Sequence, residues 1–86
     1  MRNVRSVAAF VNVVSAGSFS AAAVTLGVTP AAVSKSVQNL ERELGVRLLN
    51  RSTRRLGLTE EGEFFYERSR SALLDLDNAV SAVIES

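Results

Sequence analysis

The chain has 86 residues, 47% of them hydrophobic, a formal net charge of +1, and neither cysteine nor histidine. This length fits one small domain with an ample core, and the missing residue types exclude disulfides, thiolate metal sites and the usual general base. No apolar run approaches the ~20 residues of a membrane helix, and no cleavage pattern follows the basic residues 1–5. We therefore expect a cytoplasmic protein that is not an enzyme and holds no metal or cofactor in this chain.

Charge is unevenly divided along the sequence. Residues 1–59 carry eight lysines and arginines against two glutamates, a net +6, whereas residues 60–86 carry two arginines against seven acidic residues, a net −5. A basic half predicts a polyanionic partner. We expect a domain boundary at this change, with a compact domain over residues 1–59 and a separate linker or dimerisation helix over residues 60–86.

The first predicted helix covers residues 3–15. Its apolar residues recur at helical spacing, which predicts a buried stripe formed by Val7, Phe10, Val11 and Val14. Ala16-Gly17 should end this helix, and Ser18 is a candidate N-cap for the next.

A short second helix over residues 20–26 is followed by a tight turn. Gly27 can adopt the left-handed conformation that ends a helix, and Val28 should fill the core beneath the turn. Thr29-Pro30 is typical of a helix start, because threonine caps the first N–H groups and proline has none to lose.

The third predicted helix covers residues 30–44. Its apolar stripe is Val33, Val37, Leu40 and Leu44. The opposite face offers Ser34, Lys35 and Gln38, with no acid before Glu41. Two helices joined by a short glycine-containing turn are typical of a helix-turn-helix, whose second helix enters a DNA groove.

A β-hairpin is predicted next, with a strand over residues 48–51, a tip at Ser52-Thr53 and a return strand over residues 54–58. A two-stranded hairpin must lie against the helices to be stable. The arginines Arg51, Arg54 and Arg55 suit phosphates or a minor groove. A solvated basic loop is the alternative.

Thr59 should cap a final helix over residues 60–85, about 39 Å long at ~1.5 Å per residue. Its first turns should be anchored on the domain by Phe64, Phe65 and Tyr66. Further along, apolar and small residues recur in steps of four and three, a heptad pattern. They predict a dimer surface of Phe65, Ser69, Leu73, Leu76, Val80 and Val83. Alternatively, these residues cover another part of the same chain.

Many spaced positions together resemble the DNA-binding domain of LysR-type transcriptional regulators. They are Phe10, Gly17-Ser-Phe19, Ala22-Ala23, Leu26, Val28-Thr29, Ala32-Val33-Ser34, Leu40-Glu41, Leu44-Gly45, Leu48, Arg51 and Leu58-Thr59-x-x-Gly62. The resemblance implies a mainly α winged helix-turn-helix, made of three helices and a two-stranded wing, followed by a long linker helix.

The resemblance also implies partners. It suggests sequence-specific binding to double-stranded DNA at a palindromic site with a T-N11-A core. It also suggests a homodimer, or a tetramer built as a dimer of dimers, paired through antiparallel linker helices. It further implies a domain beyond Ser86 that binds a small-molecule inducer.

The residue pattern of the third helix and the hairpin, together with the family resemblance, indicates candidate DNA contacts. Base edges should be read by Thr29, Pro30, Ala31, Ser34 and Lys35, and the backbone should be met by Gln38, while Ser18 is a possible phosphate contact. The wing should contribute Arg51, Thr53, Arg54 and Arg55. Alternatives are that Ser18 and Thr29 are only caps, that Pro30 and Ala31 only start the helix, and that Lys35 meets phosphate.

The start of the third helix departs from the family pattern, which is commonly Ser-Gln-Pro-Ala-Val-Ser-Arg. Here Pro30 replaces the glutamine, Ala31 the proline and Lys35 the arginine. Proline cannot make the bidentate contact of glutamine, and lysine lacks the fork of arginine. The fold and the groove should therefore carry over, but not the bases read.

Two other binding classes compete with this interpretation. A winged helix used only for protein contacts disagrees with the +6 charge of residues 1–59. A winged-helix DNA binder of another regulator family fits the long last helix and the Leu58-Thr59-x-x-Gly62 step less well.

Overall fold

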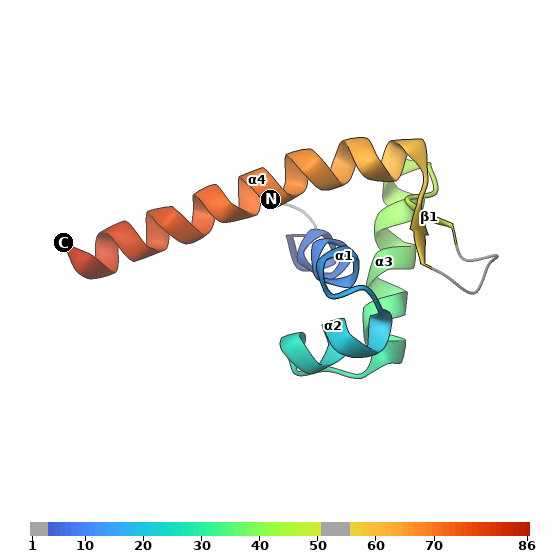
Figure 1. Cartoon of the computed structure of the whole chain (residues 1–86), viewed down its shortest axis with the longest axis horizontal. Helices are drawn as coiled ribbons and strands as arrows, with labels where there is room; N and C mark the ends of the chain where they lie inside the picture. The colour runs from blue at the N-terminus through green and yellow to red at the C-terminus, as the bar shows by residue number, and fades with distance from the viewer. Residues whose placement is uncertain (1–3, 51–55) are drawn as a thin grey trace.

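The computed structural model describes residues 4–50 and 56–86. Its elements, in chain order, are α1 (Val4–Ala16), α2 (Phe19–Leu26), α3 (Pro30–Leu44), β1 (Leu49–Asn50), β2 (Gly57–Leu58) and α4 (Glu60–Glu85). The first three helices form a compact body, and α4 projects from it as an arm, which gives extents of 47 × 25 × 20 Å (Figure 1). The predicted mainly α winged helix-turn-helix with a long last helix is confirmed.

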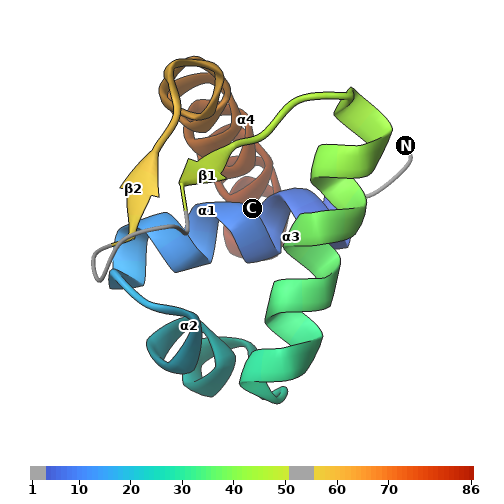
Figure 2. The ribbon, with the colours of Figure 1, turned by 90° about the vertical axis from the view of Figure 1, so that its right-hand side faces the viewer.

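The core lies where α1, α2 and α3 meet in pairs (Figure 2). Phe10 and Val13 of α1 and Val37 of α3 are completely buried. The other buried apolar residues are Ala9, Val11, Ala22, Ala23, Val33, Leu40, Leu48 and Leu49. Alanines at the centre of α2 let the three helices approach closely, because a small side chain leaves room for a neighbouring backbone.

Side-chain caps and left-handed glycines fix the helix-turn-helix. The Ser18 hydroxyl accepts from the Ala21 N–H at 3.0 Å, and the Thr29 hydroxyl accepts from the Ala32 N–H at 3.1 Å. Gly27 ends α2 with a φ of 70°, and Gly45 ends α3 with a φ of 75°. These local signals fix where α2 and α3 begin and end, so both helices carry their side chains in a defined register.

The hairpin pairs antiparallel, with Leu49 opposite Leu58 and Asn50 opposite Gly57. Leu48 and Leu49 are buried at its base, so the wing rests on the helical core as a two-stranded ribbon must. The predicted strand residues 51 and 54–55 lie outside the described part of the chain.

The start of α4 is joined to the hairpin. The Thr59 hydroxyl donates to the Arg47 carbonyl at 2.6 Å and accepts from the Gly62 N–H at 2.9 Å, while the Thr59 N–H donates to the Leu48 carbonyl at 3.0 Å. Gly62 is buried, and a Cβ there would overlap the Leu48 carbonyl oxygen. Thus glycine at this position allows α4 to lie directly on the chain entering β1.

Aromatic packing then holds α4 on α1. The Phe10 ring lies 5.9 Å from the Phe65 ring and 6.3 Å, edge-on, from the Tyr66 ring, and the hydroxyls of Tyr66 and Ser15 are 3.0 Å apart. The prediction that Phe64 also anchors α4 is wrong. Phe64 is 63% exposed, and the Arg68 guanidinium lies over its ring, 4.3 Å from the ring centre.

Three core assignments from the sequence also need correction. Val28 is 48% exposed, because the turn at Gly27 leaves it at the edge of the core. Leu44 is 42% exposed, because α3 extends past the core before Gly45 ends it. Val13 was missed by the predicted stripe and is fully buried, whereas Val7 and Val14 are half-buried.

Candidate nucleic-acid interface

One long face of α3 is exposed and carries no acidic side chain. Ala31, Lys35, Gln38 and Arg42 are spaced by four, three and four residues and are all exposed. Residues at this spacing share one face of a helix. The buried residues of α3 lie on the other side of the helix: Val33, Val37, Leu40 and Glu41. The face therefore offers two cations, an amide and a methyl group to a partner.

The predicted base-reading residues gather at the N-terminal end of this face. Thr29, Pro30 and Ala31 are exposed, and Ser34 is half-buried beside Lys35. The capping role of Thr29 is confirmed by its bond to the Ala32 N–H. Base contacts by these five residues, and a backbone contact by Gln38, stay predictions.

Ser18 lies outside this face, at the start of α2. Its side chain is exposed, and its hydroxyl caps the helix by accepting from the Ala21 N–H. The capping interpretation is thus confirmed, and a phosphate contact by Ser18 stays a prediction.

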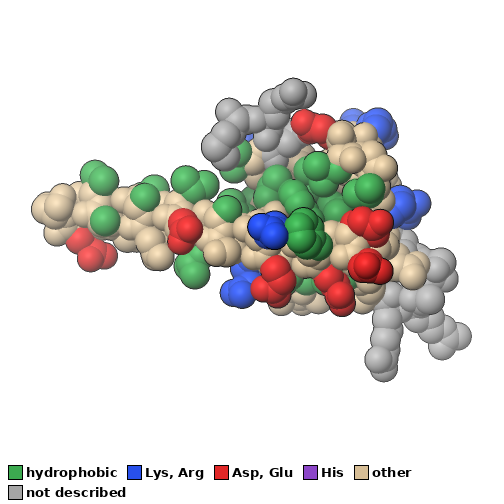
Figure 3. Space-filling view, turned by 90° about the horizontal axis from the view of Figure 1, so that it is seen from above, with side chains coloured by type: hydrophobic (Ala, Val, Ile, Leu, Met, Phe, Trp, Pro, Cys, Tyr) green, Lys and Arg blue, Asp and Glu red, His purple; other side chains and the backbone are tan. Residues whose placement is uncertain are grey.

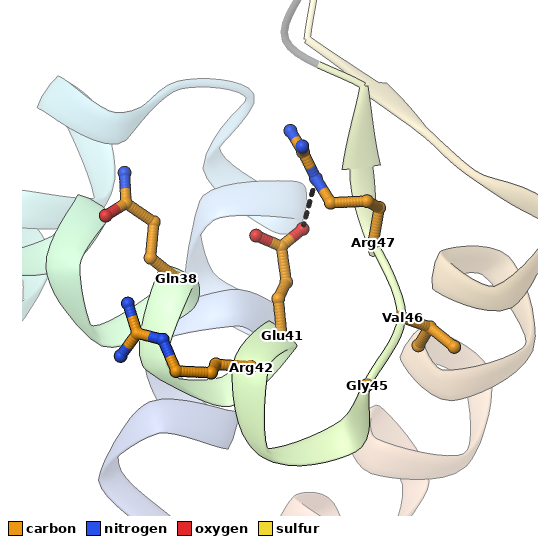
Figure 4. Close-up of a pocket in the computed structure, with 6 residues that line it drawn as sticks. All are labelled: Gln38, Glu41, Arg42, Gly45, Val46 and Arg47. Carbon is orange, nitrogen blue, oxygen red and sulfur yellow. Dashed lines mark ion pairs between the residues drawn. The ribbon is translucent and has the colours of Figure 1, made fainter.

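Glu41 is a buried polar residue whose structural role the sequence did not predict. It is 6% exposed, and its Oε2 accepts from the backbone N–H groups of Leu48 at 2.7 Å and Leu49 at 3.1 Å. The same oxygen lies 3.7 Å from the Nε of Arg47 (Figure 4). Its spacing of four from Val37 is the signal that could have placed this acid on the buried side of α3. Glu41 thereby ties α3 to the first strand of the wing.

The predicted wing contacts are Arg51, Thr53, Arg54 and Arg55, and they lie outside the described residues. The structure does describe both ends from which they extend, Asn50 in β1 and Leu56 before β2. Asn50 is exposed and Leu56 is packed against the core.

The predicted dimer surface on α4 is divided in two. Ser69 is buried by its own chain, and Phe65 and Leu73 are half-buried against the core, so the prediction of a continuous exposed stripe is wrong for this first half. The helix crosses α1 there, which supplies the contacts. Leu76, Val80 and Val83 are 47%, 57% and 75% exposed, and a dimer contact through them stays a prediction.

Acidic side chains gather on another face of the molecule. Viewed from above, they lie mainly over the first half of α4, around exposed apolar side chains (Figure 3). They include Glu60, Glu61, Glu63 and Glu67, all exposed. This distribution separates an acidic α4 from the cationic face of α3. No helix in the described ranges is long and apolar enough to cross a membrane.

Comparison with known proteins gives consistent matches. Residues 4–63 match the model of the family described as bacterial regulatory helix-turn-helix protein, lysR family. The chain is 51% identical over 74 residues to an HTH-type transcriptional regulator of Xanthomonas campestris pv. campestris (strain 8004), covering 86% of this chain and 22% of that protein. It is 47% identical over 77 residues to the HTH-type transcriptional repressor PA14_22550 of Pseudomonas aeruginosa (strain UCBPP-PA14), covering 90% of this chain and 24% of the repressor.

A solved structure with DNA is also similar. The BenM DNA-binding domain, crystallised as a complex with benA site 1 DNA, superposes with a TM-score of 0.88 at 39% identity, covering 99% of this chain and 94% of that one. By contrast, the chain spans about a quarter or less of the length of the two curated relatives.

Proposed function

This chain belongs to the lysR family of bacterial regulatory helix-turn-helix proteins and forms a DNA-binding domain of that family, and on this premise we propose how its elements share the work. In the proposal, α3 reads bases in the major groove, the hairpin wing contacts the minor groove or the backbone, and α4 pairs two copies. The domain is a regulator's binding module and not an enzyme.

The exposed face of α3 is the observation that carries the base-reading role. Lys35 can donate to the O6 or N7 of guanine, Ser34 can donate or accept, and Pro30 and Ala31 offer apolar contact to a thymine methyl. These side chains occupy the first turns of α3, the part that enters the groove in helix-turn-helix proteins. Phosphate contacts by the arginines would add affinity without sequence preference.

The proposed dimer rests on the exposed part of α4. Leu76, Val80 and Val83 continue a heptad spacing on a helix that the core no longer covers. Apolar residues exposed in this way are typical of an interface. Two copies related by a two-fold axis would bind a palindromic site, for which we propose the T-N11-A core. A tetramer is proposed for the longer protein.

Two further proposals concern a longer protein, of the length of these relatives, that would contain this chain. We propose that a separate domain of such a protein binds a small-molecule inducer, as the family resemblance implies; the chain itself spans 22% and 24% of those two relatives. We also propose a cytoplasmic location, where a regulator meets bacterial DNA.

The proposal is tested by titrating the chain against two duplexes of about 25–30 bp, one with a T-N11-A palindrome and one scrambled, at several salt concentrations. We expect the palindrome to bind more tightly and Lys35→Ala to reduce that preference. Arg51→Ala, in the wing, should weaken both duplexes alike. Equal binding of wild type to both duplexes would overturn the proposed site or the proposed base-reading residues, and binding to neither would overturn the function.

A further inference from the structure

The C-terminal end of α3 borders a shallow hollow of about 590 Å3. Six residues line it: Gln38, Glu41, Arg42, Gly45, Val46 and Arg47. Figure 4 shows Gln38 and Arg42 leaving the same side of α3, while Arg47 reaches back toward that helix from the loop before β1. Helix, turn and loop thus bring two arginines, five positions apart in the sequence, to one concave surface.

The hollow is electropositive where it meets solvent. The Arg47 side chain is 67% exposed and Arg42 is exposed, whereas the side chain of Glu41, the one acid in the lining, is only 7% exposed. Glu41 directs Oε2 at the N–H groups of Leu48 and Leu49. A ligand entering the hollow would therefore meet guanidinium groups before it met the carboxylate.

Both arginines are oriented by neighbouring side chains. The Arg42 Nη1 donates to the Asn39 Oδ1 at 2.9 Å, and the Arg47 Nε lies 3.7 Å from the Glu41 Oε2. The hydrogen bond of Arg42 and the ion pair of Arg47 each involve one side of a planar guanidinium, which has five N–H donors in all. A positioned guanidinium loses less side-chain entropy on binding an anion than a freely rotating one.

The hollow lies on the continuation of the base-reading face. Arg42 shares that face with Lys35 and lies seven residues further along, roughly 10.5 Å at ~1.5 Å per residue. The major groove is only about 12 Å wide, so a helix whose first turns reach base edges has its later turns beside the sugar-phosphate backbone that borders the groove. Arg42 and Arg47 are placed there.

We infer that Arg42 and Arg47 each contact a phosphate of the DNA backbone at the edge of the groove read by α3. These contacts rest on the proposed mode of DNA binding. Arginine is suited to them because its fork can donate two parallel hydrogen bonds to phosphate oxygens. Through Glu41, which pairs with Arg47 and accepts from the N–H groups of Leu48 and Leu49, the phosphate contacted by Arg47 would also fix the wing relative to α3.

The test compares four proteins, wild type, Arg42→Ala, Arg47→Ala and the control Arg70→Ala, on the palindromic and the scrambled duplex. Arg70 lies on α4 with its side chain 53% exposed, so all three variants lose one positive charge from the surface. Removing a phosphate contact should lower the slope of log binding constant against log salt by about one. Raising the salt from 50 to 200 mM lowers the binding constant by some factor. That factor should therefore be roughly fourfold smaller for Arg42→Ala and Arg47→Ala than for wild type.

The expected loss is the same on both duplexes, because a phosphate carries no sequence information. Arg47→Lys should recover most of the slope lost in Arg47→Ala, since it keeps the charge. A duplex with one neutral methylphosphonate at the position contacted by Arg42 should bind wild type more weakly, whereas the affinity of Arg42→Ala should be unchanged. Thermal unfolding of each variant excludes a loss of folded protein as the cause.

Two results would overturn the inference while the proposed function stands. One is that the slopes of Arg42→Ala and Arg47→Ala match that of Arg70→Ala. The other is that their losses occur on the palindrome alone, which would assign the arginines to bases. A wild-type chain that binds neither duplex at low salt would overturn the proposed function, and the phosphate contacts with it.

Discussion

Gly62 of α4 packs directly against the backbone carbonyl of Leu48, and no side chain fits between them. The nearby Thr59 hydroxyl and N–H bond the same stretch of chain through the carbonyls of Arg47 and Leu48. One helix turn thus fixes α4 to the base of the wing.

Gly62→Ala should destabilise the fold. Alanine would gain about 1 kcal/mol of helix propensity, but overpacking against a backbone atom costs typically 1–3 kcal/mol or more, because the carbonyl cannot rotate away. Urea unfolding should show a net loss. The control is Gly57→Ala, where nothing lies within 4 Å of the added Cβ, and it should be neutral or slightly stabilising. Equal stabilities of the two variants would contradict the close approach.

Glu41→Ala should be among the most damaging polar substitutions. It removes the acceptor of two buried N–H groups, those of Leu48 and Leu49, and each unsatisfied group costs about 1–3 kcal/mol. We expect the free energy of unfolding, measured by urea titration, to fall by about 2–5 kcal/mol. Asp75→Ala, on an exposed face of α4, is the matched control and should change stability by less than about 0.5 kcal/mol. A Glu41→Ala protein as stable as its control would rule out the bonding described.

Phe10→Ala and Phe64→Ala should differ widely although both remove a phenyl ring. Phe10 of α1 is fully buried and packs against the rings of Phe65 and Tyr66, so replacing it with alanine should cost about 3–5 kcal/mol of stability. Phe64 is 63% exposed, and its loss should cost less than about 1 kcal/mol, mainly through its contact with Arg68. Thermal unfolding of both variants measures the difference. A larger loss of stability for Phe64→Ala than for Phe10→Ala would contradict the burial described for these two rings.

Leu76→Glu should convert a dimer to a monomer. The residue is 47% exposed on the apolar side of α4, and a paired helix would bury an unpaired carboxylate from each copy. We expect dimerisation to weaken by more than about tenfold, measured by analytical ultracentrifugation. Leu74→Glu is the control, because Leu74 is 54% exposed on a different face of the helix. If Leu74→Glu dissociates the dimer and Leu76→Glu does not, the interface lies on the other side of α4.

Thr29→Ala should lower stability by about 1 kcal/mol through the lost cap on the Ala32 N–H. Thr29→Ser keeps the capping oxygen and should retain most of that stability. The comparison is Thr25→Ala, within α2, where alanine removes only a 3.4 Å bond to the Ala21 carbonyl and improves helix propensity. Urea titration should show a lower free energy of unfolding for Thr29→Ala than for Thr29→Ser or Thr25→Ala. An unchanged free energy of unfolding for Thr29→Ala would contradict a stabilising cap at this position.

The helices could be placed from sequence because their ends depend on nearby residues. Thr29-Pro30 and Gly45 bound α3, and Thr59 starts α4, through bonds and backbone angles within a turn or so of the boundary. The stripe of Val33, Val37 and Leu40 then fixed which side of α3 is exposed, and with it the face carrying Lys35.

Contacts between distant segments could not be read in the same way. Three adjacent aromatics start α4, and helical periodicity alone did not say which would meet Phe10, since that depends on the angle at which α4 leaves the wing. Glu41 appeared to be the first solvated acid of α3. Only the return of the chain at Leu48 shows its carboxylate bound to buried N–H groups.

The fixed junction between α4 and the wing has a mechanical consequence. From Thr59 onward the helix is continuous to Glu85, and its first turns are bonded to the base of β1, so within the described residues no hinge separates the projecting end from the hairpin. The projecting end of α4 is therefore joined rigidly to the base of the wing, and the aromatic contact with α1 lies between the two. A force applied near Val83 would therefore be transmitted along α4 to the base of the wing.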